Sequence, residues 1–182
     1  PRIDPEIFKL GIPVLGICYG MQFMVDPLDG NVKQAERREY GFAEFRIKKS
    51  GTLFNRIPSK VQCWMSHGDS IVKLPRGFAV TGSTENTEIA AMANEKRRLF
   101  GLQFHPEVEH TPKGSQMLRN FLVDICGCKR SWSMKSFASE AIAQIKDTVH
   151  EKRVILGLSG GVDSSVTALL IHKAIGKKLI CI

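Results

Sequence analysis

A cysteine lies between two glycines in the segment Gly16-Ile17-Cys18-Tyr19-Gly20. Residues 12–17 are apolar, as in a short buried strand, and Met21 to Val25 has the pattern of a helix start. Glycines two places before and after a nucleophile allow the sharp turn that exposes its side chain. The helix start would favour the thiolate of Cys18, and the backbone N–H of Tyr19 would face a developing oxyanion. The pattern indicates a nucleophile, and a small buried cysteine is the alternative it leaves open.

A histidine and a glutamate further along the chain could complete this chemistry. The segment Gly101-Leu102-Gln103-Phe104-His105-Pro106-Glu107 continues an apolar run, so His105 should lie just past the end of a strand. From there a general base could reach a thiol on a neighbouring strand, and Glu107 could orient the imidazole. A lone histidine at a strand end is usually structural. Downstream of the Cys18 turn, however, this arrangement predicts a nucleophile, base and carboxylate.

A Gly/Ser-rich segment, Ser159 to Ser165, has the features of a phosphate-binding loop. It follows the apolar run Val154–Leu158 and precedes a helical pattern over Val166–Ala174. Glycines let the backbone approach an anion, and a helix start offers unpaired N–H groups and the positive end of a dipole. The segment therefore predicts a bound nucleotide. For Asp163, contact with Mg²⁺ and capping of the helix are both open.

The elements that must position these motifs follow from the apolar periodicity. Phe42–Ile47 and Val61–Met65 are predicted strands, and Glu88–Ala93 with Leu99–Phe104 is a predicted hairpin around a polar tip. A last strand begins at Leu179. Helical spacing occurs twice: at Met117, Leu118, Phe121, Leu122 and Ile125, and at Phe137, Ala141, Ile142, Ile145 and Val149. Strands that alternate with helices predict α/β layers with a mainly parallel sheet.

The small, polar and basic connection Cys126–Ser133 marks a domain boundary. We place the first domain at residues 1–127 and the second at residues 128–182. Cys126-Gly127-Cys128 could be half of a metal site, but no second Cys/His pair at zinc-like spacing accompanies it, so ordinary loop cysteines are favoured. Because the chain starts at Pro1 without Met and stops inside an apolar run, we expect it to be part of a longer protein.

The composition excludes several classes of protein. The 182 residues are 43% hydrophobic and contain no apolar run of about 18 residues, so no membrane-spanning helix is expected. Five cysteines, an odd number without a secretory signal, favour reduced thiols and a cytoplasmic protein. The net charge of +8 would suit nucleic acid or phosphorylated small substrates. The basic residues are scattered and not interleaved with aromatic ones, so nucleic acid is not the expected partner.

Two sets of motifs resemble known families. Pro13-Val14-Leu15-Gly16-Ile17-Cys18-Tyr19-Gly20-Met21-Gln22 with Phe104-His105-Pro106-Glu107 is similar to the class I, or triad, glutamine amidotransferases. Trp64–Asp69 and Arg38–Gly41 resemble their GMP synthetase branch, and Ser159–Ser165 resembles the pyrophosphate loop of the ATP pyrophosphatases. Together they resemble the glutamine-hydrolysing GMP synthetase family over essentially the whole chain. The resemblance implies an α/β fold: a mixed amidotransferase sheet with flanking helices, then the first βαβ part of a parallel-sheet ATP pyrophosphatase domain.

The resemblance also implies roles for individual residues. Cys18 would attack the side-chain amide of glutamine, His105 would carry the proton and Glu107 would hold His105, whereas His67 is structural. The residues that align with glutamine binding are Gln22, Ser66, Gly68 and Asp69. The residues that align with the binding of ATP and Mg²⁺ are Gly157, Leu158, Ser159, Gly160, Gly161, Val162, Asp163, Ser164 and Ser165. The implied acceptor is XMP, adenylated by ATP and then aminated to GMP, in a homodimeric enzyme.

The same resemblance places further parts of the family before Pro1 and after Ile182, among them a second oxyanion donor and the acceptor site. Residues 1–182 alone are therefore expected to form no GMP and to release little ammonia from glutamine. Two alternatives remain. One is another triad amidotransferase fused to an ATP pyrophosphatase that acts on a different acceptor, such as tRNA. The other is a non-catalytic module that retains the fold.

Overall fold

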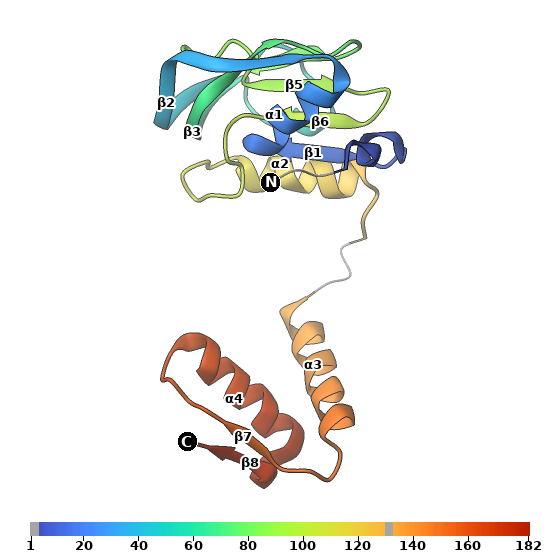
Figure 1. Cartoon of the computed structure of the whole chain (residues 1–182), viewed down its shortest axis with the longest axis vertical. Coiled ribbons are helices and arrows are strands. Elements are labelled where there is room, and N and C mark those ends of the chain that lie inside the picture. Colours follow the sequence, from blue (N-terminus) through green and yellow to red (C-terminus); the bar gives the residue numbers. More distant parts are fainter. Residues whose placement is uncertain (1–3, 130–132) are drawn as a thin grey trace. The chain divides into compact units, whose positions relative to one another are not determined.

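A computed structural model describes residues 4–129 and 133–182, and the chain divides into two compact units, 1–129 and 130–182 (Figure 1). Residues 130–132 of the predicted connection Cys126–Ser133, and the start of the chain at Pro1, lie outside the described residues. Within the described ranges, no helix is long and apolar enough to cross a membrane. The two units are described in turn.

The first unit is built on one mixed sheet with the strand order β1-β6-β5-β4-β2-β3. The strands are β1 (Val14–Ile17), β2 (Asn31–Ile47), β3 (Lys60–Lys73), β4 (Ala79–Ser83), β5 (Ala91–Asn94) and β6 (Leu99–Leu102). β1 and β6 are parallel, and every other neighbouring pair in this sheet of the described residues is antiparallel. The mixed sheet is thus confirmed. The expectation of a mainly parallel sheet is wrong for this unit, because short turns join β5 to β6 and β4 to β5 and permit antiparallel pairing.

Helices cover both faces of this sheet. On one face α1 (Tyr19–Val25) buries Met21 and Met24 against Met92 and Leu99. On the other face Met117 packs in a cluster that contains aromatic side chains from β2 and β6. That face carries α2 (Gly114–Arg119) and the π-helical turn η4 (Asn120–Ile125), which together realise the helix predicted over residues 117–125. The short 3-10 turns are η1 (Pro5–Lys9), η2 (Asp26–Leu28) and η3 (Thr52–Phe54).

A close contact between α1 and β6 sets the height of the helix above the sheet. A Cβ atom on Gly101 of β6 would lie 2.6 Å from Cγ of Met21, so a larger residue at position 101 would push α1 away. The predicted hairpin is confirmed: β5 and β6 pair in register, from Ala91 opposite Leu102 to Asn94 opposite Leu99. The sheet and the helix start that follows β1 are therefore held in a fixed relation.

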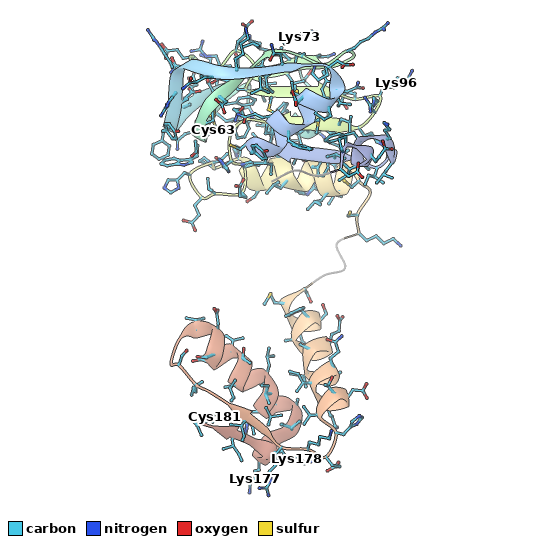
Figure 2. All side chains as sticks on the ribbon, in the orientation of Figure 1. Cys63, Lys73, Lys96, Lys177, Lys178 and Cys181 are labelled. Carbon is cyan, nitrogen blue, oxygen red and sulfur yellow. The ribbon has the colours of Figure 1, made fainter. Side chains whose placement is uncertain are left out.

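The second unit is a βαβ arrangement preceded by a helix. Its elements are α3 (Met134–Val149), β7 (Val154–Leu156), α4 (Val162–Ile175), the 3-10 turn η5 (Gly176–Lys178) and β8 (Leu179–Cys181). β7 and β8 are parallel and in register, which requires the crossover that α4 provides. Figure 2 labels Lys177 and Lys178 in η5 and Cys181 at the end of β8. The predicted helix, strand, loop, helix and strand are all present in this order.

Candidate active site

Cys18 occupies a strained turn between β1 and α1. Its φ of 50° lies in the left-handed region, which a residue with a side chain rarely adopts. Its carbonyl accepts hydrogen bonds from the N–H groups of Met21 and Gln22, the first turn of α1. A Cβ atom on Gly16 would lie 2.6 Å from the carbonyl carbon and oxygen of Gly20, whereas a Cβ on Gly20 would meet nothing within 4 Å. Of the two glycines, only Gly16 is thus required by the space inside the turn.

Parallel pairing brings the predicted base to the same edge of the sheet. The N–H of Cys18 donates to the carbonyl of Leu102 at 2.7 Å, which extends the pairing of β1 with β6 by one residue. Three residues further on, the N–H of His105 donates to the carbonyl of Trp64 in β3 at 3.0 Å. The thiol of Cys18 faces the carbonyl of Ser66, also in β3, at 3.6 Å. Cys18, Ser66 and His105 therefore gather where β1 and β6 end.

Glu107 contacts His105 directly. Nδ1 of His105 lies 2.6 Å from Oε1 of Glu107, so Nδ1 is the protonated ring nitrogen and Nε2 is available as a base. The hydroxyl of Thr111 donates to the carbonyl of His105 at 2.7 Å and accepts from the N–H of Trp64 at 3.1 Å. This pair of bonds ties the loop that carries His105 to β3. The arrangement matches a base whose tautomer is set by a carboxylate.

The environment of Cys18 favours the protonated thiol. Burial raises the pKa of Cys18 above its ordinary value, and the carboxylate of Glu107 raises it further. The N–H of Tyr19 and the side-chain amide of Gln103 lower the pKa, but by less than burial raises it. The helix start thus favours the thiolate through the N–H of Tyr19, as expected, but burial has the larger effect on the pKa of Cys18. The sulfur needs a base to become a nucleophile.

Cys63 provides a contrast within the same unit. It is fully buried on β3 (Figure 2), where burial raises its pKa to about 12. Such a thiol is inert. Cys18, half-buried at the edge of the sheet, has the access that Cys63 lacks.

The residues predicted to bind glutamine lie close to Cys18 but differ in their surroundings. Gln22 and Asp69 line a cavity of about 480 Å³ together with Tyr19. Ser66 is exposed, and Gly68 is half-buried beside the side chain of Arg38; neither lines this cavity. The side-chain nitrogen of Gln22 donates to the carbonyl of Asp69 at 3.0 Å, so that part of its hydrogen-bonding capacity is used within the protein.

His67 belongs to a buried polar cluster on the far side of β3, as expected for a structural histidine. Its Nδ1 donates to the carbonyl of Asp69 at 2.8 Å, and its Nε2 lies 3.7 Å from Oε2 of Glu39. Oε2 of Glu39 also accepts from the hydroxyls of Thr84 at 2.9 Å and Thr87 at 2.6 Å. Burial raises the pKa of Glu39, but the hydrogen bonds from His67, Thr87 and Thr84 outweigh burial and leave that pKa below its usual value.

Two functional features were not predicted from the sequence. Glu39 lies in a polar stretch that shows no sign of burial. Gln103 is completely buried and its amide contacts the sulfur of Cys18 at 3.7 Å. A signal for Gln103 did exist, since it is the one polar residue in the run from Leu99 to Phe104. A polar side chain in a buried strand must find a partner.

In the second unit the Gly/Ser-rich segment connects β7 to α4. Gly160 has a φ of +79°, and α4 begins at Val162 without a side-chain cap, so its first N–H groups point into the loop. The hydroxyl of Ser159 donates to that of Ser164 at 3.0 Å, and Ser164 donates to the carbonyl of Gly161 at 3.0 Å. These hydrogen bonds within the loop therefore hold its conformation.

The loop offers few ligands for a metal ion. Asp163 is exposed in the first turn of α4. Among the residues described, no cluster of three or more His, Cys, Asp and Glu side chains could bind a metal, either here or at Cys126 and Cys128. One carboxylate holds Mg²⁺ in a protein chiefly together with substrate phosphates. A metal would thus fit this loop only along with a nucleotide.

Leu158 joins the loop to the small sheet. Its N–H donates to the carbonyl of Ile182 at 2.8 Å, and the N–H of Ile182 donates to the carbonyl of Leu156 at 3.0 Å. Gly157, one residue earlier, has open space where a Cβ would be. Strand pairing thus fixes the backbone that precedes the Ser159–Ser165 loop, and the space beside Gly157 stays open.

Comparison with known proteins agrees with this geometry. Residues 1–125 match the family model for glutamine amidotransferase class-I, and residues 137–181 match the model for NAD synthase. The chain belongs to the class I glutamine amidotransferases. Within that class it is similar to glutamine-hydrolysing GMP synthases: 56% identical over all of its residues to that of Carboxydothermus hydrogenoformans and 53% to that of Heliobacterium modesticaldum. It spans 36% of the length of each of these relatives.

Solved structures support the same class. A putative GMP synthase subunit from Thermoplasma acidophilum is 34% identical, with a TM-score of 0.64 over 66% of this chain and 60% of the other. A glutamine amidotransferase from Thermotoga maritima is 27% identical, with a TM-score of 0.53 over 66% of this chain and 50% of the other. The resemblance drawn from the motifs, to a GMP synthetase with an amidotransferase part and the start of an ATP pyrophosphatase part, is confirmed.

The two glycines around Cys18 should respond differently to a methyl group. Gly16→Ala places a Cβ against the backbone of Gly20 and should lower the free energy of unfolding by about 3 kcal/mol. Gly20→Ala, the matched control, has open space and lies in α1, so stability should be unchanged or rise by up to about 1 kcal/mol. Urea unfolding followed by circular dichroism measures both. Equal effects of the two substitutions would contradict this account of the turn.

The buried Glu39 should make stability depend on pH. Its pKa is lower in the folded protein than in the unfolded chain, so its contribution is present above about pH 4.3 and is lost as the pH falls through the folded pKa. Glu39→Gln should cost about 3 kcal/mol at neutral pH and flatten this acid dependence. Glu44→Gln, an exposed control on the same strand, should cost less than about 1 kcal/mol. Urea unfolding across the pH range decides; an unchanged slope in Glu39→Gln would exclude this role.

Proposed function

We propose that the protein acts as a glutamine-hydrolysing GMP synthase, in which ammonia released at Cys18 replaces an oxygen of XMP that ATP has activated. The observation that carries the proposal is the strained turn at Cys18 at the end of β1, with the His105–Glu107 pair three residues past the end of the paired strand β6, in a chain that also holds the Gly/Ser-rich loop before α4. The relatives at 56% and 53% identity are GMP synthases by name. XMP as the acceptor rests on those relatives, of whose length this chain spans 36%.

In the first reaction Cys18 is the nucleophile. Nε2 of His105 takes the thiol proton as the sulfur attacks the side-chain amide carbon of glutamine, and the N–H of Tyr19 stabilises the negative oxygen of the tetrahedral intermediate. His105 then gives the proton to the leaving nitrogen, which departs as ammonia and leaves a glutamyl thioester on Cys18. His105 then deprotonates a water that attacks the thioester carbonyl; the C–S bond breaks, glutamate leaves, and the proton on His105 returns to the sulfur of Cys18. Glu107 stabilises the imidazolium in each step.

In the second reaction the loop from Gly157 to Ser165 would hold ATP. The N–H groups at the start of α4 would face the phosphates, and Mg²⁺ would bind through phosphate oxygens with Asp163 as the nearby carboxylate. Transfer of AMP to the C2 oxygen of XMP releases pyrophosphate and makes that oxygen a good leaving group. Ammonia then displaces AMP and gives GMP.

Substitution of Cys18 should separate the two reactions. In an enzyme that carries this chain, Cys18→Ala should abolish GMP formation with glutamine as the nitrogen donor and leave GMP formation with added ammonia intact. GMP is measured by chromatography with each nitrogen donor. Glu109→Gln, an exposed residue of the same loop that makes no contact with His105 in the described structure, should leave both reactions unchanged.

Three outcomes would contradict the proposal. Loss of both reactions in Cys18→Ala would show that Cys18 is not a dedicated glutaminase nucleophile. Amination of a different acceptor, such as tRNA, in place of XMP would assign the chain to another member of the class. Absence of both ammonia release and nucleotide amination in the unaltered enzyme that carries this chain would indicate a non-catalytic module.

Strain in the loop should control affinity for ATP. Gly160→Ala forces a side chain into a positive φ of +79°, at a cost of about 1–2 kcal/mol unless the loop changes shape, so ATP should bind about tenfold more weakly. Gly176→Ala, at the other end of α4, introduces the same kind of strain at a φ of +56° away from the loop. It should lower stability without a change in affinity. Calorimetric titration with ATP and Mg²⁺ measures this, and equal affinities of the two variants would refute a role of the loop.

A further inference from the structure

Gln103 is a completely buried amide that contacts the sulfur of Cys18. It follows β6, and its N–H donates to the carbonyl of Ala90 at 2.9 Å, which fixes its backbone. Its side-chain nitrogen lies 3.7 Å from Sγ of Cys18. Its side-chain oxygen accepts from the side-chain nitrogen of Gln22 at 3.1 Å. Both ends of this buried amide therefore have partners within the site.

The hydrogen bonds around Gln22 decide which end of the Gln103 amide faces the sulfur. The carbonyl of Asp69 can only accept, so the atom of Gln22 that lies 3.0 Å away must be its NH₂ group. The same nitrogen has a second hydrogen, which it gives to Gln103, so the facing atom of Gln103 must be its oxygen. The NH₂ group of Gln103 is then the end that faces Sγ. The backbone carbonyl of Asp69 in β3 thus orients the amide of Gln22. That amide in turn orients the amide of Gln103, so that its NH₂ group faces Cys18.

The other groups around Cys18 favour different protonation states. The carbonyl of Ser66 accepts from the thiol and so favours the protonated form. The carboxylate of Glu107 also disfavours a negative sulfur, whereas the imidazole of His105 can receive the proton. An N–H donor favours the thiolate, because hydrogen bonds to charged acceptors are the stronger ones. Along with the N–H of Tyr19, the amide of Gln103 lowers the pKa of Cys18 against the larger effect of burial.

We propose that Gln103 is a catalytic residue that stabilises the Cys18 thiolate through its side-chain amide, and that Gln22 is the positioning residue that fixes this amide. The proposal rests on the assignment of Cys18 as the nucleophile, and it adds a function to two residues. Gln22 aligns with glutamine binding in the family, but its NH₂ group is fully used by Asp69 and Gln103. Part of any effect of a Gln22 substitution should therefore pass through Gln103.

The test measures how the reactivity of Cys18 depends on pH in the 182-residue chain, without glutamine. The rate of alkylation by iodoacetamide is followed for each cysteine separately by peptide mass spectrometry. Gln103→Met, which keeps the size but removes the donor, should slow Cys18 about tenfold at pH 7 and move its profile about one unit to higher pH. Gln22→Met should move the profile in the same direction by a smaller amount, because the Gln103 amide is then free to turn.

Internal controls separate a local effect from unfolding. Cys63 is fully buried and should stay unreactive while the variant is folded, and exposed Cys128 should react as before. Asn120→Leu removes a different buried amide, one bonded to the carbonyls of Leu53 and Asn55, and should leave the Cys18 profile unchanged. If Cys63 becomes reactive in Gln103→Met, that variant is unfolded, and the profile of Gln22→Met decides the test.

An unchanged Cys18 profile in the folded variants would overturn the proposal, as would an equal shift in Asn120→Leu. The measurement needs neither glutamine nor XMP. A shifted profile in the chain, together with no GMP formation by the unaltered enzyme that carries it, would therefore refute the proposed function alone, and an unshifted profile together with an active enzyme would refute the role of Gln103 alone.

Discussion

The parallel pairing of β1 with β6 is the constraint on which the site depends. The hydrogen bond from the N–H of Cys18 to the carbonyl of Leu102 fixes the register in which one strand ends at the nucleophile and the other continues to His105. A slip by one residue would turn every side chain of β1 to the other face of the sheet. The glycines at 16 and 101, where a Cβ would meet the backbone of Gly20 or the side chain of Met21, keep helix and strands at the distance that this pairing needs.

The local chemistry of the site could be read from the sequence because it depends on short spacings. Cys18 between glycines, and His105 two residues before Glu107, define a turn and a hydrogen-bonded pair without knowledge of distant residues. The loop from Ser159 to Ser165 was predicted for the same reason, since strand, turn and helix are consecutive. The βαβ order of the second unit follows directly from such consecutive signals.

The remainder depends on pairing between distant residues, which periodicity does not encode. β2 and β3 extend well beyond the predicted segments Phe42–Ile47 and Val61–Met65, because polar residues such as Glu39 satisfy their backbone groups across the two strands, opposite His67. The mixed sheet likewise depends on which strands are joined by short turns, because only those strands can pair antiparallel as hairpins. Gln103 could have been suspected as a polar residue in a buried run, but its partners Cys18 and Gln22 lie more than 80 residues away in the sequence.

The carbonyl of Asp69 connects the two polar networks of the first unit. It accepts from Nδ1 of His67 on one side and from the side chain of Gln22 on the other, so both of its lone pairs are used. His67 is held by buried Glu39, and Gln22 in turn orients the amide that faces Cys18. A buried polar network contributes order only when every member is satisfied, and the described residues leave no buried side-chain nitrogen or oxygen without a partner. The contact between His67 and Glu39 thus stabilises more than the fold, because His67 also holds the carbonyl of Asp69, which orients Gln22 and, through it, the amide that faces Cys18.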